Sequence, residues 1–249
     1  MIDPRETIIG KRLEKVKSII AVSGGKGGVG KSLVASTLAL TLARKNFKVG
    51  LFDLDFTSPS THLILGVKDA KPKEEKGIIP AEVYGLKYVS VVAYSKEKPL
   101  PLRGADISNA LIELFAATIW GDLDFLIVDM PPGISDATLD LIRLIKGIKF
   151  LIVTTPSPLA FETVKKLLGL LAELKVPVLG VVENMKMRKS ALVSRNVTCA
   201  GLPFLGDLPF DPKVEESLGN VDALLKTDFA KKLAAIVSKI PFNPNWLFS

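Results

Sequence analysis

Residues 23–32 read Ser23-Gly24-Gly25-Lys26-Gly27-Gly28-Val29-Gly30-Lys31-Ser32. Within this segment, residues 25–32 match the phosphate-binding pattern G-x-x-x-x-G-K-S/T. Residues 17–22, just before it, are mostly apolar and predict a short buried strand. Residues 33–44, just after it, contain no Gly or Pro and predict a helix. A phosphate-binding loop requires this order of strand, glycine-rich turn and helix, so a loop that only turns the chain is the weaker interpretation.

The chemistry of this loop follows from its residue types. Glycines allow successive backbone N–H groups to surround a phosphate, and the N-terminus of the following helix adds a positive dipole end. In this pattern the lysine, here Lys31, reaches the β- and γ-phosphates, and the hydroxyl, here Ser32, binds Mg²⁺. The predicted nucleotide-binding residues of the loop are Gly25, Lys26, Gly27, Gly28, Val29, Gly30, Lys31 and Ser32.

The composition is typical of a globular protein with a large core. The 249 residues are 48% hydrophobic and 24% charged, and the net charge is +7. Basic residues are scattered without a block of five like charges, so a nucleic-acid partner is not expected. No run of about 18 uncharged apolar residues exists, so no transmembrane helix is expected. The two prolines of the tail at 241–249 argue against an amphipathic membrane helix, so membrane contact is not expected. The first residues lack the apolar core of a signal peptide and there is one cysteine, so we expect a cytoplasmic protein.

The order of the predicted elements indicates the fold class. Apolar strands that alternate with helices predict an α/β fold, a mostly parallel twisted sheet with helices on both faces. We expect a single P-loop NTPase domain over residues 1–249, with a short lead-in helix at 5–16 and an apolar tail at 241–249 that packs on the domain. Residues 66–87 are expected to be irregular. The expected strands are 17–22, 49–52, 86–92, 125–129, 150–154, 178–182 and 203–206, and the other helices are 33–44, 107–119, 135–146, 158–174 and 222–239.

Polar residues follow several of these strands at the point where each strand ends. Ligands bind outside the carboxyl ends of parallel strands, so we expect Asp53, Asp129 and Glu183 to lie at the edge that carries the loop. Asp129 is predicted to hold Mg²⁺ or its water shell. The alternative, that Asp129 caps the helix at 135–146, is weaker because Ser135 is the natural N-cap of that helix.

Asp53 and Asp55 form a second acidic feature. They lie two residues apart, so in an extended strand both side chains would point the same way. Two neighbouring carboxylates repel each other, and a divalent cation relieves that repulsion. For Asp55, the alternative is a cap of the turn at 56–59.

The sequence indicates less clearly which residues contact the base and the γ-phosphate of the nucleotide. A guanine-reading loop would carry N-K-x-D, whereas Asn184 is followed by Met185-Lys186-Met187, which favours adenine. Gly133 follows two prolines in a stiff turn, and its N–H group could approach the γ-phosphate.

Two residues are given structural roles. His62 is the only histidine, and a lone histidine is expected to be surface or core filler rather than a ligand. Cys199 is expected to be a small buried apolar side chain near the start of the last strand, rather than a metal ligand.

Several motifs together resemble one family of ATPases. The second loop lysine, Lys26, matches the pattern K-G-G-x-G-K-S/T of the MinD, ParA and Mrp ATPases. The segments Asp-Met-Pro-Pro-Gly and Val-Glu-Asn-Met are typical of the Mrp branch, which the chain resembles nearly end to end. The other matching segments are Asp53-Leu54-Asp55 with Ser58-Pro59-Ser60, Ser135-Asp136, and residues 153–156 and 206–212.

The resemblance implies a Mg²⁺-dependent, slow ATPase that forms a homodimer around ATP. In this family the lysine at Lys26 crosses to the partner subunit's nucleotide, as an arginine finger would. The implied catalytic residues are Lys26, Lys31 and Asp55, which orients the attacking water. The implied Mg²⁺ residues are Ser32, Asp53 and Asp129, and the implied adenine-facing positions are Asn184, Pro209, Phe210 and Asp211.

The resemblance also suggests a role in metallocofactor assembly. Mrp proteins carry or help to insert iron–sulfur clusters and place a C-x-x-C after Val-Glu-Asn-Met. Residues 186–204 hold only Cys199, so no iron–sulfur cluster is expected from that residue alone. Residues 1–5 and 101–113 look most like the archaeal Mrp-type ATPase of nickel–iron hydrogenase maturation, whose partner is a nickel metallochaperone. We therefore expect a metallochaperone or cofactor-assembly protein as partner. The alternatives are a ParA- or MinD-like positioning switch on DNA or membrane, and an iron–sulfur cluster carrier proper.

Overall fold

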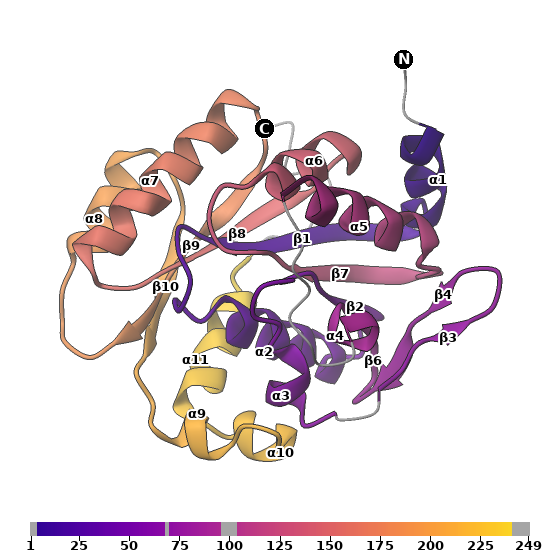
Figure 1. The fold of residues 1–249 in the computed structure, drawn as a ribbon. Helices are drawn as coiled ribbons and strands as arrows, with labels where there is room; N and C mark the ends of the chain where they lie inside the picture. The colour runs from indigo at the N-terminus through magenta and orange to yellow at the C-terminus, as the bar shows by residue number, and fades with distance from the viewer. Residues whose placement is uncertain (1–3, 68–69, 96–103, 241–249) are drawn as a thin grey trace.

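The structure, a computed structural model, describes residues 4–67, 70–95 and 104–240, and an eight-stranded sheet lies at its centre (Figure 1). The strand order is β10-β9-β8-β1-β7-β2-β6-β5, and all neighbouring pairs are parallel except β5 and β6. The predicted α/β fold is confirmed. The strands are β1 Val16–Gly24, β2 Val49–Asp53, β5 Ala81–Val83, β6 Leu86–Ser90, β7 Leu123–Asp129, β8 Lys149–Thr154, β9 Val178–Lys186 and β10 Phe204–Pro209.

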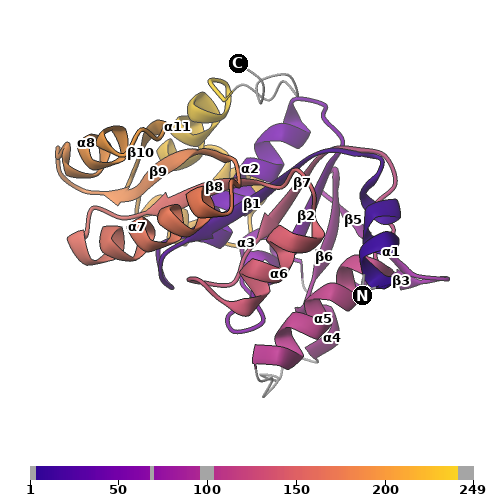
Figure 2. The same ribbon diagram turned by 90° about the horizontal axis from the view of Figure 1, so that it is seen from above.

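Helices cover both faces of the sheet (Figures 1 and 2). One face carries α1 Pro4–Leu13, α5 Gly104–Ala117, α6 Asp136–Leu144, α7 Pro158–Glu173 and α8 Leu192–Cys199. The other face carries α2 Lys31–Arg44, α3 Thr61–Leu65, α9 Lys213–Glu216, α10 Val221–Leu224 and α11 Asp228–Val237. A four-residue helix, α4 Val92–Ser95, follows β6.

The central strands contribute residues to two separate apolar cores, one on each face of the sheet. In β1, Ile19 and Ala21 pack under the α1–α5–α6–α7–α8 layer, whereas Ile20 and Val22 pack under α2. Successive side chains of a strand point to opposite faces, so a strand buried on both faces is apolar throughout. This burial explains why the β1 sequence shows a continuous apolar run before the glycines.

Two predicted helix starts are confirmed. The Ser135 hydroxyl accepts the Thr138 N–H at the start of α6. The Ser157 hydroxyl accepts the Ala160 N–H at the start of α7, and Pro158 takes the first helical position. Both serines therefore satisfy backbone N–H groups that have no partner inside the helix.

The structure corrects two predicted elements. The single helix expected at 222–239 is two helices: the first ends at Leu224, and Thr227 caps the second by accepting the Ala230 N–H at 3.1 Å. Residues 66–87, expected to be irregular, contain the hairpin of β3 Lys73–Glu74 and β4 Ile78–Ile79 and then the antiparallel edge strand β5. The predicted tail at 241–249 lies outside the described residues.

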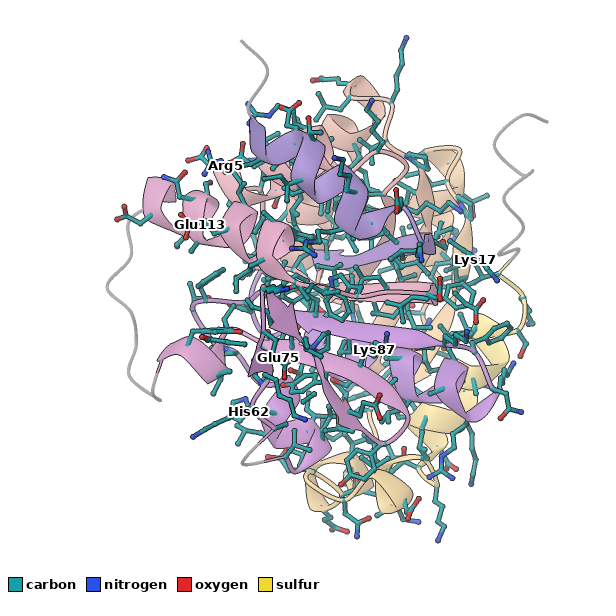
Figure 3. All side chains as sticks on the ribbon, turned by 90° about the vertical axis from the view of Figure 1, so that its right-hand side faces the viewer. Arg5, Lys17, His62, Glu75, Lys87 and Glu113 are labelled. Atoms are coloured by element: carbon teal, nitrogen blue, oxygen red, sulfur yellow. The ribbon has the colours of Figure 1, made fainter. Side chains whose placement is uncertain are left out.

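The predicted burial of Cys199 is wrong. Cys199 is an exposed residue at the end of α8, a helix that the sequence analysis does not include. Val193 and Val197 are four residues apart on the buried face of α8, which leaves Cys199 on an exposed face. His62 lies on α3, on the opposite side of the sheet from Arg5 of α1 and Glu113 of α5 (Figure 3), and α3 lies far from α8 in Figures 1 and 2.

Candidate nucleotide-binding site

A cavity of about 510 Å³ lies at the sheet edge where the parallel strands end. One half of its wall is polar and comes from the glycine-rich loop, the turn after β2 and the start of α3. The other half is largely apolar and comes from the ends of β9 and β10 and from α9 and α11. The lining residues are Gly27, Gly28, Gly30, Lys31, Ser32, Leu33, Asp55, Thr57, Ser58, Ser60, Ile64, Pro132, Asn184, Met185, Pro209, Phe210, Asp211, Pro212, Val214, Glu215, Leu218 and Phe229. Its size and its division into polar and apolar halves fit a nucleotide.

Glycines are required at two places in the loop. Gly30 has φ +86° and directly precedes α2, so an L-residue there would be strained. A Cβ atom at Gly25 would lie 2.6 Å from the Val164 backbone nitrogen of α7, so only glycine allows this close approach. The loop therefore ends in the N-terminus of a 14-residue helix, as anion binding requires.

The two loop lysines have different environments. Lys31 is 5% exposed and lines the cavity. Lys26 is exposed, and it does not line the cavity. Gly25 and Val29 do not line it either, since Gly25 faces α7 and Val29 is 1% exposed. The structure thus places Lys31 in the cavity wall beside the glycine-rich loop and leaves Lys26 outside that wall.

Asp129 has the properties expected of a metal ligand. It is fully buried, and neither carboxylate oxygen has a hydrogen-bond partner among the residues that the structure describes. Burial and the Asp53 carboxylate raise its pKa well above the ordinary value, while the nearby Ser32 hydroxyl and Lys31 ammonium partly offset this rise. Mg²⁺ is commonly bound by one or two carboxylates together with phosphate oxygens and water. Ser32 and Asp129 therefore fit a Mg²⁺ ion bound with a nucleotide.

Asp53 lies opposite Asp129 in the neighbouring strand and is already saturated with donors. Its Oδ1 accepts the Asp55 N–H, and its Oδ2 accepts the Thr61 hydroxyl at 2.6 Å, the Thr61 N–H and the Ser90 hydroxyl. Burial raises the Asp53 pKa, and the bonds from Thr61 and Asp55 counteract that rise. This arrangement suits a carboxylate that supports the metal's water shell, which remains a prediction.

Asp55 lines the cavity and also organises the turn that follows it. Its Oδ1 accepts the Thr57 hydroxyl at 2.6 Å and the N–H groups of Thr57 and Ser58 at 3.1 and 3.0 Å. The turn-capping alternative for Asp55 is therefore what the structure shows. The water-orienting role stays a prediction and would use the same carboxylate.

The residues predicted to face adenine lie together at the apolar end of the cavity. The Asn184 amide nitrogen donates to the Val29 carbonyl at 3.0 Å, which ties β9 to the loop. Phe210 is 55% exposed and offers an aromatic face. The Asp211 carboxylate accepts hydrogen bonds from the N–H groups of Lys213, Asp228 and Phe229, so its side chain joins α9 to α11. The Asp211 backbone is therefore the part of the residue that is free to contact a base.

Gly133 has a different partner from the predicted one. Its N–H donates to the Gly24 carbonyl at 3.0 Å, and Gly133 does not line the cavity. An approach to a γ-phosphate would require that bond to break.

Comparison with known proteins identifies the family. The family model named ParA, which is described as NUBPL iron-transfer P-loop NTPase, matches residues 15–243. The chain belongs to this family. The predicted resemblance to the MinD, ParA and Mrp ATPases is thereby confirmed.

Relatives of this P-loop NTPase carry iron–sulfur names. It is 39% identical over 222 residues to an iron–sulfur cluster carrier protein of Aquifex aeolicus, covering 83% of this chain and 61% of that protein. It is 33% identical to an Arabidopsis thaliana protein named as required for mitochondrial NADH dehydrogenase, covering 94% and 83%. The chain spans about 61% of the A. aeolicus relative and 62% of a Pseudomonas fragi relative of the same name.

Solved structures agree on the fold. An ADP-bound nucleotide-binding protein of Archaeoglobus fulgidus superposes with a TM-score of 0.71 at 27% identity, covering 98% of this chain and 96% of that one. MinD of Pyrococcus horikoshii, bound to Mg-ADP, gives 0.66 at 21% identity, covering 90% and 95%. The second likeness concerns the fold alone. None of the described helices of this P-loop NTPase is long and apolar enough to cross a membrane.

Part of the cavity wall is absent from the sequence-based prediction. Ser60 and Ile64, with Thr57 and Ser58, line the cavity from the turn after β2 and from α3. Ser58-Pro59-Ser60 matches the family resemblance, and its position just after Asp55 is the signal that places it at the ligand-binding edge. Met185, whose place in the sequence only helps to exclude a guanine motif, also lines the cavity.

Replacing Asp129 by Asn should stabilise the metal-free protein. The neutral amide would remove a buried charge that has no partner in the described structure. We expect the free energy of unfolding near pH 7 to rise by about 1–2 kcal/mol. Because the pKa of Asp129 is raised in the folded state, the cost of burying this carboxyl grows as the pH rises from its ordinary pKa to the raised pKa, so the gain should be largest above the raised pKa and should vanish as the pH falls to the ordinary value.

Thermal unfolding with a chelator across a pH series measures this effect, and the exposed Asp122→Asn serves as the charge-matched control. The same Asp129→Asn protein should lose Mg²⁺-dependent nucleotide binding. A metal-free Asp129→Asn protein less stable than wild type at pH 7 would contradict the assignment of an uncompensated carboxylate.

Proposed function

We propose that this chain is a Mg²⁺-dependent ATPase whose two copies enclose ATP, and that it assists metallocofactor assembly by acting on a metal-binding partner protein. The observation that carries the nucleotide part is the fully buried Asp129, unpartnered among the described residues and close to Lys31 and Ser32 of the loop. Phosphate oxygens and a divalent cation would satisfy both the carboxylate and the loop N–H groups.

In the proposed reaction, positioning and charge do most of the chemical work. Asp55 orients a water molecule toward the γ-phosphate. The water oxygen forms a bond to phosphorus as the bond to the ADP oxygen breaks, and a proton of that water passes to an oxygen of the phosphate that is released. Lys31 and the loop N–H groups hold the charge that moves to that leaving oxygen. Mg²⁺, when bound, neutralises charge on the phosphate oxygens. Hydrolysis stays slow until a second subunit supplies Lys26.

The proposed role in metallocofactor assembly rests on the relatives. Those of A. aeolicus and P. fragi are named as iron–sulfur cluster carriers, and an Anopheles gambiae relative, 36% identical over 86% of this chain, is named as a cytosolic iron–sulfur assembly factor. This chain has one cysteine, whereas a cluster is usually held by four thiolates. A partner that holds the iron or nickel reconciles the family with the cysteine count.

Asp55→Asn tests the ATPase and dimer together. The amide oxygen of the introduced side chain can still accept the three bonds that Asp55 Oδ1 accepts from residues 57 and 58, so the turn should survive. Loss of the charge should slow ATP turnover about 10²-fold and lengthen the life of the ATP-bound dimer. Sedimentation with ATP and with ADP, together with phosphate release, measures both effects. Rapid hydrolysis in Asp55→Asn would refute the water-orienting role.

The partner is found by a pull-down with the trapped Asp55→Asn protein, comparing ATP with ADP and identifying captured proteins by mass spectrometry. A metal-binding protein captured in one nucleotide state supports the assembly role. Capture of DNA or lipid vesicles in that state would instead support a ParA- or MinD-like positioning switch.

Iron content separates an assembly factor from a cluster carrier. Two copies of this chain offer two thiolates in total, and water or a partner would have to supply the other ligands. Although Cys199 is exposed rather than buried, that count is unchanged. Protein purified without oxygen should therefore be colourless, with iron well below one atom per subunit. Stoichiometric iron with a cluster absorption band, lost in Cys199→Ser, would restore the carrier function.

A further inference from the structure

A second cavity, of about 640 Å³, lies at the edge of the sheet next to the nucleotide cavity. We call it the basic cleft. Four of its lining residues are cations, Lys186, Arg188, Lys189 and Lys232, and Asp207 is its one acid; Met187, Ser190, Ala191 and Pro209 complete the wall. It is formed by the segment between β9 and α8, the end of β10, and α11, which Figure 1 shows close together at the β10 edge.

The shape of the cleft depends on a β-bulge in β9. Glu183 pairs with Asp207 and Lys186 pairs with Pro209, so two residues of β9 lie opposite the single residue Leu208 of β10. Met185, inside the bulge, has φ +58°, a conformation uncommon for a residue with a side chain. Bulges of this kind redirect side chains beside binding sites. Here the bulge sends Met185 to the nucleotide cavity and Lys186 to the basic cleft.

Lys186 holds the cleft together. Its ammonium contacts the fully buried Glu183 carboxylate at 2.6 Å and donates to the Ser190 carbonyl at 2.6 Å. Asp207 lies 3.7 Å from it and is also bound by Lys232 at 3.1 Å. The bond to Ser190 anchors the 187–190 segment to the end of β9. The charges of Lys186 and Lys232 are paired with carboxylates of this chain.

Two cations of the cleft have no ion-pair partner among the residues that the structure describes. Arg188 and Lys189 are exposed, and within the part of the chain that the structure describes no ion pair or hydrogen bond of their side chains is found. Two exposed apolar side chains come from the same part of the chain: Met187 (75% exposed) lines the cleft, and Leu192 (47%) is the first residue of α8. Arginine and methionine are enriched at protein-binding surfaces.

We propose that the basic cleft docks an acidic, partly apolar segment of a partner protein, and that its occupation is coupled to the nucleotide cavity. Arg188 and Lys189 pair with carboxylates of that segment, and Met187 and Leu192 cover its apolar side chains. A nucleic acid fits less well, because none of the residues lining the cleft is aromatic and so none offers a stacking face to a base, whereas the exposed Met187 and Leu192 fit apolar side chains.

The coupling has a short physical route. Met185 and Lys186 are adjacent residues that line different cavities, and Pro209 lines both. The Lys186 carbonyl accepts the Phe210 N–H at 3.1 Å, which links the ends of β9 and β10. A segment bound at Arg188 and Lys189 contacts the residues next to Lys186, so its binding biases the positions of Met185 and Phe210 at the apolar end of the nucleotide cavity.

Docking is tested with a fluorescent peptide of alternating Glu and Leu, a Gln-for-Glu version of it, and a single-stranded DNA of equal charge. The variant is Arg188→Glu/Lys189→Glu, and the matched control is Lys11→Glu/Lys15→Glu on and after α1, which carries the same change in net charge at exposed lysines far from the cleft. We expect the acidic peptide alone to bind wild type, and its affinity to fall at least about tenfold in the cleft variant and little in the control. Equal loss in both variants, equal binding of the Gln peptide, or preferential binding of DNA would overturn the proposal.

The coupling rests on the proposed ATP binding, whereas the docking does not. Peptide affinity is therefore measured without nucleotide and with a saturating non-hydrolysable ATP analogue, and a change of about fivefold or more is expected. Unchanged peptide affinity in protein that calorimetry shows to bind the analogue would overturn the coupling. Absence of analogue binding itself would overturn the proposed function and leave the docking result standing.

Discussion

Lys31→Ala should abolish tight ATP binding while the protein stays folded. Lys31 is 5% exposed at the phosphate end of the cavity and directly follows Gly30, where α2 begins. Removing one partner of a buried charge pair costs about 2–5 kcal/mol of binding free energy, so we expect the dissociation constant to rise by about two orders of magnitude or more. The loop conformation should persist, because it depends on the glycines and on the Asn184 bond to Val29.

Calorimetric titration with Mg-ATP measures the loss, and circular dichroism checks the fold. Lys15→Ala is the matched control, since Lys15 is an exposed lysine just before β1, at the other end of the strand. Wild-type affinity in Lys31→Ala would show that the cavity is not a phosphate site and would remove the basis of the proposed ATPase.

The parts of the site that could be predicted are those whose structure is determined by a short continuous segment of sequence. The loop glycines, the apolar strand before them and the helix after them are local, so residues 23–32 and their flanks are sufficient to predict a phosphate-binding loop. Asp53 and Asp129 are predicted to lie near it because parallel strands end at the same edge, and the register pairs these two residues in neighbouring strands.

Other features depend on contacts that a local pattern does not contain. The β9 bulge exists because β9 and β10 pair out of step between Glu183 and Lys186, which only the assembled sheet determines. The saturation of Asp53 comes from Thr61 and Ser90 on two other elements. The exposure of Cys199 is different, since the spacing of Val193 and Val197 is visible in the sequence and predicts a helix with Cys199 outside its buried face.

Lys26→Ala should leave ATP binding intact and remove ATP-dependent dimerisation and turnover together. Lys26 is exposed and absent from the wall of its own cavity, so the subunit's own nucleotide should not need it. If the side chain reaches the nucleotide of a second subunit, its loss should lower turnover by about 10³-fold, as the loss of an arginine finger does. Calorimetry, sedimentation with Mg-ATP and phosphate release measure the three quantities, with Lys15→Ala as control. An intact ATP dimer with normal hydrolysis in Lys26→Ala would exclude the crossing role.

Mixing two inactive variants decides whether Lys26 acts on its own subunit or across the dimer. In a mixed dimer, the Lys26→Ala subunit keeps Asp55 for its own nucleotide and receives Lys26 from the Asp55→Asn subunit, which restores one of two sites. Each mixed dimer has one of its two sites restored, so turnover should return in proportion to the mixed dimers that sedimentation detects, at about half the wild-type rate per dimer. If Lys26 acted within its own subunit, every site in the mixture would lack either Lys26 or Asp55, and no activity would return.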